Sequence, residues 1–176
     1  SIGVDTASYQ DIYYRLTLGH ENTHAEIGYL YINKIAALLK APYVIVQLLT
    51  VGLSVFFLHL FIKSSIRVPE QGFALIVFLC STLYLSYYCS GVRQGIAISV
   101  CLYASRYIIN RKFTKFILVV GFATLFHKSA ICFIPGYVIY RKKIKILYLI
   151  LLFVVEYFLA PYVKVVFDIL ISYVTG

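Results

Sequence analysis

Long apolar stretches, separated by short polar or basic segments, make up most of this chain. The clearest stretch, 42–62, is close to the roughly 20 residues that a helix needs to cross the core of a bilayer. Further apolar stretches follow at 73–88, 96–109, 116–126, 130–140 and 146–163. This pattern predicts an all-α fold, a polytopic integral membrane protein with about 5–6 transmembrane or half-spanning helices.

The stretch 116–140 is interrupted near its middle by His127 and its polar neighbours. Each half is well short of a full span. One long tilted helix is the alternative, but it would place one of the two flanking basic loops on the outer side of the membrane. We therefore predict a short helical hairpin with His127 at its turn.

Basic residues orient the predicted spans. They gather in the segments 63–72, 110–115 and 141–145. If each apolar stretch crosses once, all three segments lie on one side, and the positive-inside rule assigns that side to the cytoplasm. Residues 1–41, a tip around Arg93 and the turn at His127 then face the extracytoplasmic side.

Residues 1–41 differ from the rest because they are polar with aromatic interruptions. From Ile27 to Leu39, apolar positions recur at helical spacing, which predicts a helix lying against the membrane surface. The predicted domains are therefore an extracytoplasmic segment, 1–41, and a transmembrane helical bundle, 42–176.

Composition agrees with a lipid environment. Hydrophobic residues make up 61% of the chain and charged residues 13%, whereas soluble domains have about 45–50% and about 25%. The net charge of +9 indicates cytoplasmic loops rather than nucleic-acid binding. The four cysteines lie in apolar segments without a C-x-x-C pair, which predicts buried, inert thiols. Because the chain has no methionine and no signal peptide, we expect a piece of a longer membrane protein.

Arg93 lies between two apolar stretches, beside Gly91 and Gln94. An arginine in or near the hydrocarbon costs about 2.5 kcal/mol or more, so it normally has a partner or a function. A guanidinium matches phosphate oxygens with two parallel hydrogen bonds. We predict a diphosphate clamp for a lipid-linked substrate, with an arginine that reaches lipid head groups as the alternative.

His127 is a second candidate, because a histidine accepts protons near neutral pH and binds phosphate when charged. Lys128 and Ser129 beside it offer a positive charge and a hydroxyl donor. The alternatives are a histidine that bonds a carbonyl of a broken helix and a lysine that anchors the chain at the interface.

The first segment adds carboxylates and aromatic rings. Asp5, Tyr9 and Tyr13 are spaced four residues apart, so a helix would place them on one face. Asp5 and Glu26 are candidate bases for a sugar hydroxyl, and the tyrosines are candidates for stacking on sugars. The alternative is a solvated loop.

Residues 20–24 fit H-E-x-x-H, in which two histidines one helical turn apart hold zinc and the glutamate is a base. Gly19, Asn22 and Thr23 are weak helix formers, and no third ligand can be assigned. We expect a chance match and no metal. The chain also lacks a Walker A loop, a G-x-G-x-x-G and a D-x-D pair, so we expect no nucleotide and no cofactor.

Four short motifs follow one another along the chain: Gly3-Val4-Asp5 with Tyr9 and Tyr13, Glu26-Ile27-Gly28-Tyr29, Val92-Arg93-Gln94-Gly95-Ile96-Ala97, and Phe126-His127-Lys128-Ser129-Ala130. In this order and spacing they make the chain resemble the EpsG family, the Wzy-like bacterial polymerases of exopolysaccharide, capsule and O-antigen loci. The resemblance covers about residues 2 to 140.

The resemblance implies a polymerase at the outer face of the cytoplasmic (inner) membrane. It would transfer glycan from a polyprenyl diphosphate carrier to a hydroxyl of another lipid-linked repeat unit, with a flippase and a chain-length regulator as partners. The expected catalytic residues are Asp5, Glu26, Arg93 and His127. The expected substrate-binding residues are Tyr9, Tyr13, Gln94, Lys128 and Ser129. A transporter or flippase of lipid-linked glycans and a membrane zinc protease are the alternatives.

Overall fold

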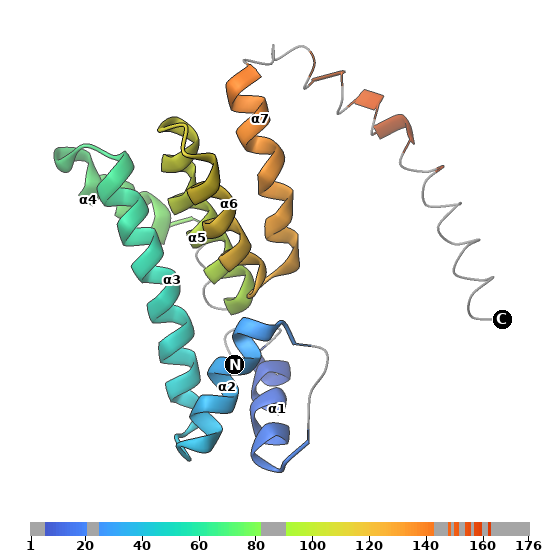
Figure 1. The fold of residues 1–176 in the computed structure, drawn as a ribbon. Coiled ribbons are helices and arrows are strands. Elements are labelled where there is room, and N and C mark those ends of the chain that lie inside the picture. The colour runs from blue at the N-terminus through green and yellow to red at the C-terminus, as the bar shows by residue number, and fades with distance from the viewer. Residues whose placement is uncertain are drawn as a thin grey trace. The chain divides into compact units, whose positions relative to one another are not determined.

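The computed structural model describes residues 6–20, 25–81 and 91–142, together with scattered positions between 148 and 162. These residues are all-helical, as predicted (Figure 1). The helices are α1 (Thr6–Thr17), α2 (Ile27–Leu38), α3 (Tyr43–Ser65), α4 (Val68–Leu79), α5 (Val92–Ile109), α6 (Phe113–Thr124), the 3₁₀ helix η2 (Lys128–Phe133) and α7 (Ile134–Lys142).

The chain divides into two compact units, Ser1–Tyr137 and Val138–Gly176. In the second unit, the described residues at its beginning, Val138, Ile139 and Tyr140, are exposed. The first unit contains the three hydrophobic clusters and all the candidate site residues that the structure describes. It is the unit that matters for the site.

Helix α3 covers the clearest predicted span and confirms that this stretch is one helix. It has 23 residues, and among the described residues it is the one helix that is both long and apolar enough to cross a membrane. Pro42 is its N-cap. The buried hydroxyls of Thr50 and Ser54 donate to the carbonyls of Val46 and Thr50, at 2.9 Å each. These bonds satisfy the hydroxyls within the helix, so they bring no unpaired polar group to its packed face.

Helix α5 packs between α3 and α6. Its buried residues Ile96, Val100, Ala104 and Ile108 recur every four positions and form one face. Tyr43 and Val46 of α3 pack in one cluster with α2 and Val92, whereas Leu53 and Phe57 pack further along, against the cluster of Ile96 and Val100. The two helices α3 and α5 therefore run in the same direction.

The predicted hairpin after residue 116 is confirmed. Helix α6 ends at Thr124, and His127 has an extended backbone, with φ −155° and ψ 118°. The chain then reverses, because the ring of Tyr137 lies 5.0 Å from that of Phe113 and 5.3 Å from that of Phe116. One long helix from 116 to 140 is thereby ruled out.

Helices α1 and α2 form an N-terminal layer against the beginning of α3. Their buried residues, Tyr9, Tyr13 and Tyr29 among them, join Tyr43 and Val46 of α3 in one cluster. The predicted helix from Ile27 is confirmed as α2. Its outward face exposes the apolar side chains of Tyr31, Ile35 and Leu38. This face has the composition of a helix that lies on a membrane.

Two predictions need correction. Val92–Gly95 belong to the first turn of α5 rather than to a tip before the span. Cys101 is buried as predicted, but Cys80 and Cys132 are exposed, since α4 has no buried residues and Cys132 faces a pocket. Cys89 lies outside the described residues.

Candidate functional site

An ion pair between α2 and α5 forms the centre of the site. Glu26 is the N-cap of α2, and Arg93 lies in the first turn of α5. The Nη1 of Arg93 donates to Oε2 of Glu26 across 67 positions of sequence. The side chain of Glu26 is 13% exposed and that of Arg93 is 24% exposed. The pair is therefore shielded from most of the surroundings, and each charge offsets the cost of burying the other.

Two tyrosines pack against the guanidinium. The Cζ of Arg93 lies 5.1 Å from the ring centroid of Tyr9 and 5.9 Å from that of Tyr29. The two rings meet edge to face, with centroids 5.4 Å apart. Cation–π attraction holds the guanidinium against these rings, so its orientation is determined by more than the Glu26 contact.

His127 approaches the other oxygen of the same carboxylate. Its Nδ1 lies 3.4 Å from Oε1 of Glu26. This nitrogen is buried and has no aligned hydrogen-bond partner among the described residues. Glu26 thus lies between a permanent cation and an imidazole, and the imidazole forms an ion pair with it when protonated.

A close backbone contact places these residues together. The N–H of Gly28 donates to the carbonyl of Leu125 at 2.7 Å, which joins the first turn of α2 to the end of α6. A Cβ on Gly28 would lie 2.9 Å from that oxygen and 3.0 Å from a ring carbon of Phe126. Glu26 and His127 are each two residues from this contact. The glycine therefore allows the approach that brings carboxylate and imidazole together.

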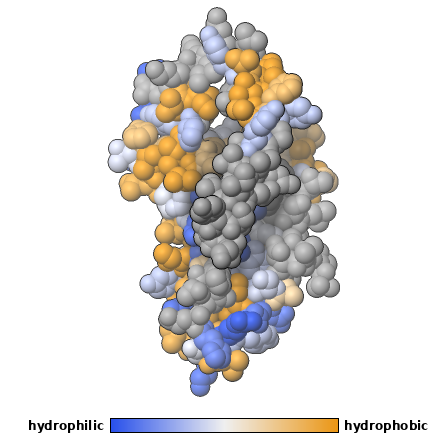
Figure 2. Space-filling view, turned by 90° about the vertical axis from the view of Figure 1, so that its right-hand side faces the viewer, coloured by the Kyte–Doolittle hydropathy of each residue, from blue (hydrophilic) through white to orange (hydrophobic). Residues whose placement is uncertain are grey.

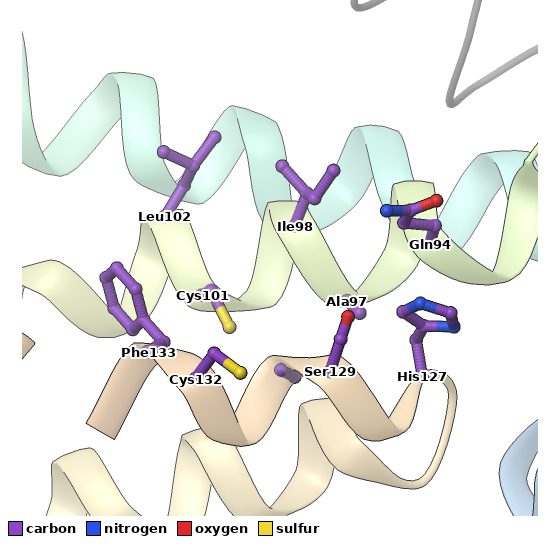
Figure 3. A pocket seen from close by; sticks show the side chains of 10 residues that line it. Gln94, Ala97, Ile98, Cys101, Leu102, His127, Ser129, Cys132 and Phe133 are labelled. Atoms are coloured by element: carbon purple, nitrogen blue, oxygen red, sulfur yellow. The ribbon is translucent and has the colours of Figure 1, made fainter. Parts of the chain in front are cut away.

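A pocket of about 340 Å³ opens beside the site, between α5 and η2 (Figure 3). Gln94, His127 and Ser129 lie toward one end of it. The rest of the lining is mostly apolar and comprises Ala97, Ile98, Cys101, Leu102, Ala130, Cys132 and Phe133. His127 belongs both to this pocket and to the Glu26 contact, so the pocket and the ion pair form one site.

The structure brings together most of the predicted residues that it describes. Tyr9, Glu26, Arg93 and His127 meet directly, and Gln94 and Ser129 line the adjoining pocket.

The other predicted residues lie elsewhere. Tyr13 is buried away from Arg93, where its hydroxyl donates to the carbonyl of Ala41 and its ring lies 5.8 Å from that of Tyr43. Lys128 is exposed at the start of η2 and is absent from the lining of the pocket. Asp5 lies outside the described residues.

Two residues without a predicted role belong to the site. Gly28 makes the backbone contact, and Tyr29 packs against Arg93 with its side chain almost fully buried. Burial raises the pKa of the Tyr29 hydroxyl far above its usual range, so this group stays neutral. Both residues follow Glu26 in one short motif, but only the packing of α2 on α5 and α6 reveals what they do.

The zinc motif stays a prediction of a chance match. Of its five residues the structure describes His20 alone. Within the described ranges, no group of three or more His, Cys, Asp and Glu side chains is placed to hold a metal ion.

The fold and the site together define a class: an all-helical protein with a strongly apolar helix and a charged interhelical site at one end of it. Over residues 1–176 the chain matches the EpsG family, a family of Wzy-like polymerases, and it belongs to that family. This membership links the chain to polysaccharide biosynthesis. No curated protein and no solved structure matches it.

Proposed function

We propose that this protein polymerises bacterial polysaccharide at the outer face of the cytoplasmic membrane. It transfers glycan from a polyprenyl diphosphate carrier to a hydroxyl of another lipid-linked repeat unit. The observation that carries the proposal is the single carboxylate of Glu26, which contacts Arg93 through one oxygen and approaches His127 with the other. In a Wzy-like family, this arrangement offers an anion site next to a base.

Arg93 serves the leaving group. In the transfer, the bond between the anomeric carbon and the diphosphate oxygen breaks, and its electron pair stays on the diphosphate. A guanidinium that faces this oxygen stabilises the developing charge. In the structure, the carboxylate of Glu26 occupies a position on Arg93 that suits a phosphate oxygen equally well. The arriving diphosphate therefore competes with Glu26 for Arg93.

Glu26 then serves the acceptor. Once the diphosphate pairs with Arg93, one oxygen of the carboxylate is released from its ion pair and is able to face the acceptor hydroxyl. It takes the proton of the attacking hydroxyl as the new bond to the anomeric carbon forms. His127 stays beside the other carboxylate oxygen and keeps it in place. Asp5 remains a further candidate for a role in this step.

The direction of the helices supports an outward-facing site. Helices α3 and α5 both start near the Glu26–Arg93 pair and run away from it. Basic residues gather near the opposite ends of the helices, at Lys63, Arg67, Arg111, Lys112 and Lys115. The positive-inside rule assigns this basic end to the cytoplasm, so the site faces outward.

The described surface supports several spans around α3. Its exposed apolar side chains include Leu48 and Phe56 in α3, Ile76 in α4 and Leu118 in α6. In Figure 2, hydrophilic side chains gather at the lower end, while large apolar areas lie higher up. Water does not favour such a surface, whereas lipid tails cover it without cost.

The test is made in the native host, by deleting the gene and resolving lipid-linked and surface glycan on a gel. If the protein is the polymerase, long chains vanish and single repeat units remain, because the units are still made and exported. If all surface glycan is lost and units accumulate inside, the protein is a flippase instead. An unchanged ladder contradicts both functions.

Complementation then tests the site. The wild-type gene restores long chains, whereas Arg93→Ala does not, because the leaving group loses its counter-charge. Arg93→Lys is the matched variant: it keeps the charge but loses the two-pronged geometry, so it restores a small part of the product. Full restoration by Arg93→Ala contradicts the proposed mechanism.

A further inference from the structure

We propose that the pocket between α5 and η2 binds the first isoprenoid units of the carrier lipid and fixes the direction in which the carrier enters the site. This inference rests on the proposed function, because it assigns a place to the tail of the same substrate. The tail site consists of Ile98, Leu102 and Phe133, for which the sequence alone indicated no role.

The pocket has two chemically different ends. Gln94 and His127 lie close together at one end in Figure 3, and the rings and aliphatic groups of Leu102 and Phe133 lie at the other. Its volume, about 340 Å³, is in the range of about 300–1,000 Å³ that small-molecule sites occupy. Such a lining suits a ligand with an anionic head and an apolar chain.

The polar end continues into the ion pair. His127 touches both features, and Gln94 follows Arg93 directly on α5. A diphosphate that displaces Glu26 from Arg93 therefore lies at the mouth of the pocket. The chain attached to it has an apolar path along α5 that begins where the head ends.

The path follows the axis of α5. Gln94, Ile98 and Leu102 are four residues apart, so they lie in a row on one face. From the first to the last, the helix rises by about 12 Å, at about 1.5 Å per residue. The row runs from the site toward the basic end of the unit, which is the direction of the bilayer interior in the proposed topology.

The polar end gives the pocket its selectivity. Lipid tails are as apolar as leucine, so burial alone does not draw an isoprenoid out of the bilayer. The diphosphate distinguishes the carrier from ordinary phospholipids, whose head carries a single phosphodiester, and the pocket then holds the chain that follows the head. Free diphosphate has this head but no chain.

Two exposed cysteines allow a direct test on the full-length protein in detergent. Cys132 lines the pocket, and Cys80 at the end of α4 does not. The rate of maleimide labelling at each thiol is followed by mass spectrometry of its peptide. A long-chain polyprenyl diphosphate at about four times its Kd slows labelling of Cys132 about fivefold, and it leaves Cys80 unchanged.

Inorganic diphosphate and phosphatidylglycerol are the comparison probes. The proposal requires that neither slows labelling of Cys132 as the polyprenyl diphosphate does. Equal protection by phosphatidylglycerol means a general lipid surface, and equal protection by inorganic diphosphate means a head-group site alone. Each of these outcomes overturns the tail site, as does equal slowing at Cys80.

A pair of variants tests the pocket in turnover. Cys132→Phe fills the pocket from an exposed position, so it raises KM for the lipid-linked donor more than it lowers kcat. Ile131→Phe places the same ring on the neighbouring residue, which is exposed and outside the lining, and leaves KM unchanged. Equal effects of the two variants contradict the proposal.

The tail site and the proposed function fail in different ways. If the polyprenyl diphosphate protects Cys132 but deletion of the gene leaves the glycan ladder unchanged, the lipid site stands and the polymerase function is wrong. If deletion abolishes long chains but no probe protects Cys132, the polymerase function stands and the tail site is wrong.

Discussion

The first unit contains two regions whose interiors are built differently. The N-terminal cluster, where α1 and α2 meet the start of α3, is rich in tyrosine and contains Tyr9, Tyr13, Tyr29 and Tyr43. The helical scaffold, where α5 meets α3 and α6, combines phenylalanines such as Phe116 with aliphatic side chains and small residues such as Ala97 and Ala104. The Glu26–Arg93 pair lies where the two regions meet.

The two regions also differ in how they treat buried polar atoms. In the scaffold, the hydroxyl of Ser99 donates to the carbonyl of Gly95 at 2.9 Å. In the N-terminal cluster, the Tyr29 hydroxyl and Oδ1 of Asn33 are buried without a well-aligned hydrogen bond among the described residues, although Tyr29 lies beside Asn33 and Tyr43. A buried polar group that makes no bond costs about 1–3 kcal/mol. The polar groups of the cluster are thus satisfied less completely than the Ser99 hydroxyl of the scaffold.

The largest effect on activity should come from the Glu26–Arg93 pair, which lies at the boundary between the two regions. Arg93→Ala removes the cation that pairs with Glu26 and, in the proposed mechanism, with the diphosphate. We therefore expect polymerisation to fall at least about 100-fold, as when one transition-state donor is lost elsewhere. Gel analysis of complemented cells, with turnover of the purified protein, measures this. The control is Tyr13→Phe, because the ring of Tyr13 packs on Tyr43 rather than on Arg93. An equal loss of polymerisation in this variant would show that substitutions in the cluster lower activity only by destabilising the protein.

The next effect tests the scaffold. Phe116 is fully buried between Phe133 and Tyr137, so Phe116→Ala should lower the free energy of unfolding by about 3–5 kcal/mol. Denaturation in detergent measures it, and KM of the protein that remains folded should not change. Phe113→Ala is the control, because Phe113 is 51% exposed and its truncation should cost far less.

A smaller effect is expected from Gly28→Ala. The added Cβ meets Leu125 and Phe126, so α2 must shift, and misplacing a reacting group by about 1 Å can cost up to about 100-fold in rate. We expect about a tenfold fall in kcat with little change in KM, since Gly28 positions Glu26 without touching substrate. Gly52→Ala in α3 is the matched control, because nothing lies within 4 Å of the added carbon. Equal loss in both variants would contradict a positioning role.

The smallest expected effect is a difference in stability between Tyr→Phe variants at two tyrosines of the same cluster. Tyr29→Phe removes a buried hydroxyl that lies beside Asn33 and Tyr43 without a well-aligned hydrogen bond, so stability should change little. Tyr13→Phe removes a bond to the carbonyl of Ala41 and should cost about 0.5–1.5 kcal/mol. Thermal unfolding of the two variants side by side measures the difference. A larger loss in Tyr29→Phe would mean that its hydroxyl is bonded in the folded protein.

The sequence predicted where the helices lie along the chain better than it predicted which helices contact one another. Apolar runs and helical spacing are local properties, so α2, α3 and the hairpin at His127 followed from them. Tyr9 and Tyr13 show the limit: their four-residue spacing correctly predicted that both lie on one face of α1, but not that this face is buried. Which of them meets Arg93 depends on how α1 packs against α5 and α3, and no local pattern contains that information.

The residues of the site also differ in whether the sequence alone could predict them. Arg93 was conspicuous between two apolar stretches, so a partner for it was predictable, and Glu26 was already a candidate in the polar first segment. The role of Gly28 was not, because it depends on the distance from α2 to α6. The pocket was equally hidden, since it requires α5 and the short helix η2 to lie side by side.

The separation of 67 positions between Glu26 and Arg93 has a consequence for how the protein matures. Contacts between distant parts of a chain form late, because closing a long loop costs entropy that local helices do not pay. The hairpin of α5 and α6 joins neighbouring segments and is able to assemble early. A newly made chain therefore has its helices before it has the Glu26–Arg93 pair. Under the function proposed above, lipid-linked precursors would be safe from wasteful cleavage by half-folded copies, and activity itself would report that folding is complete.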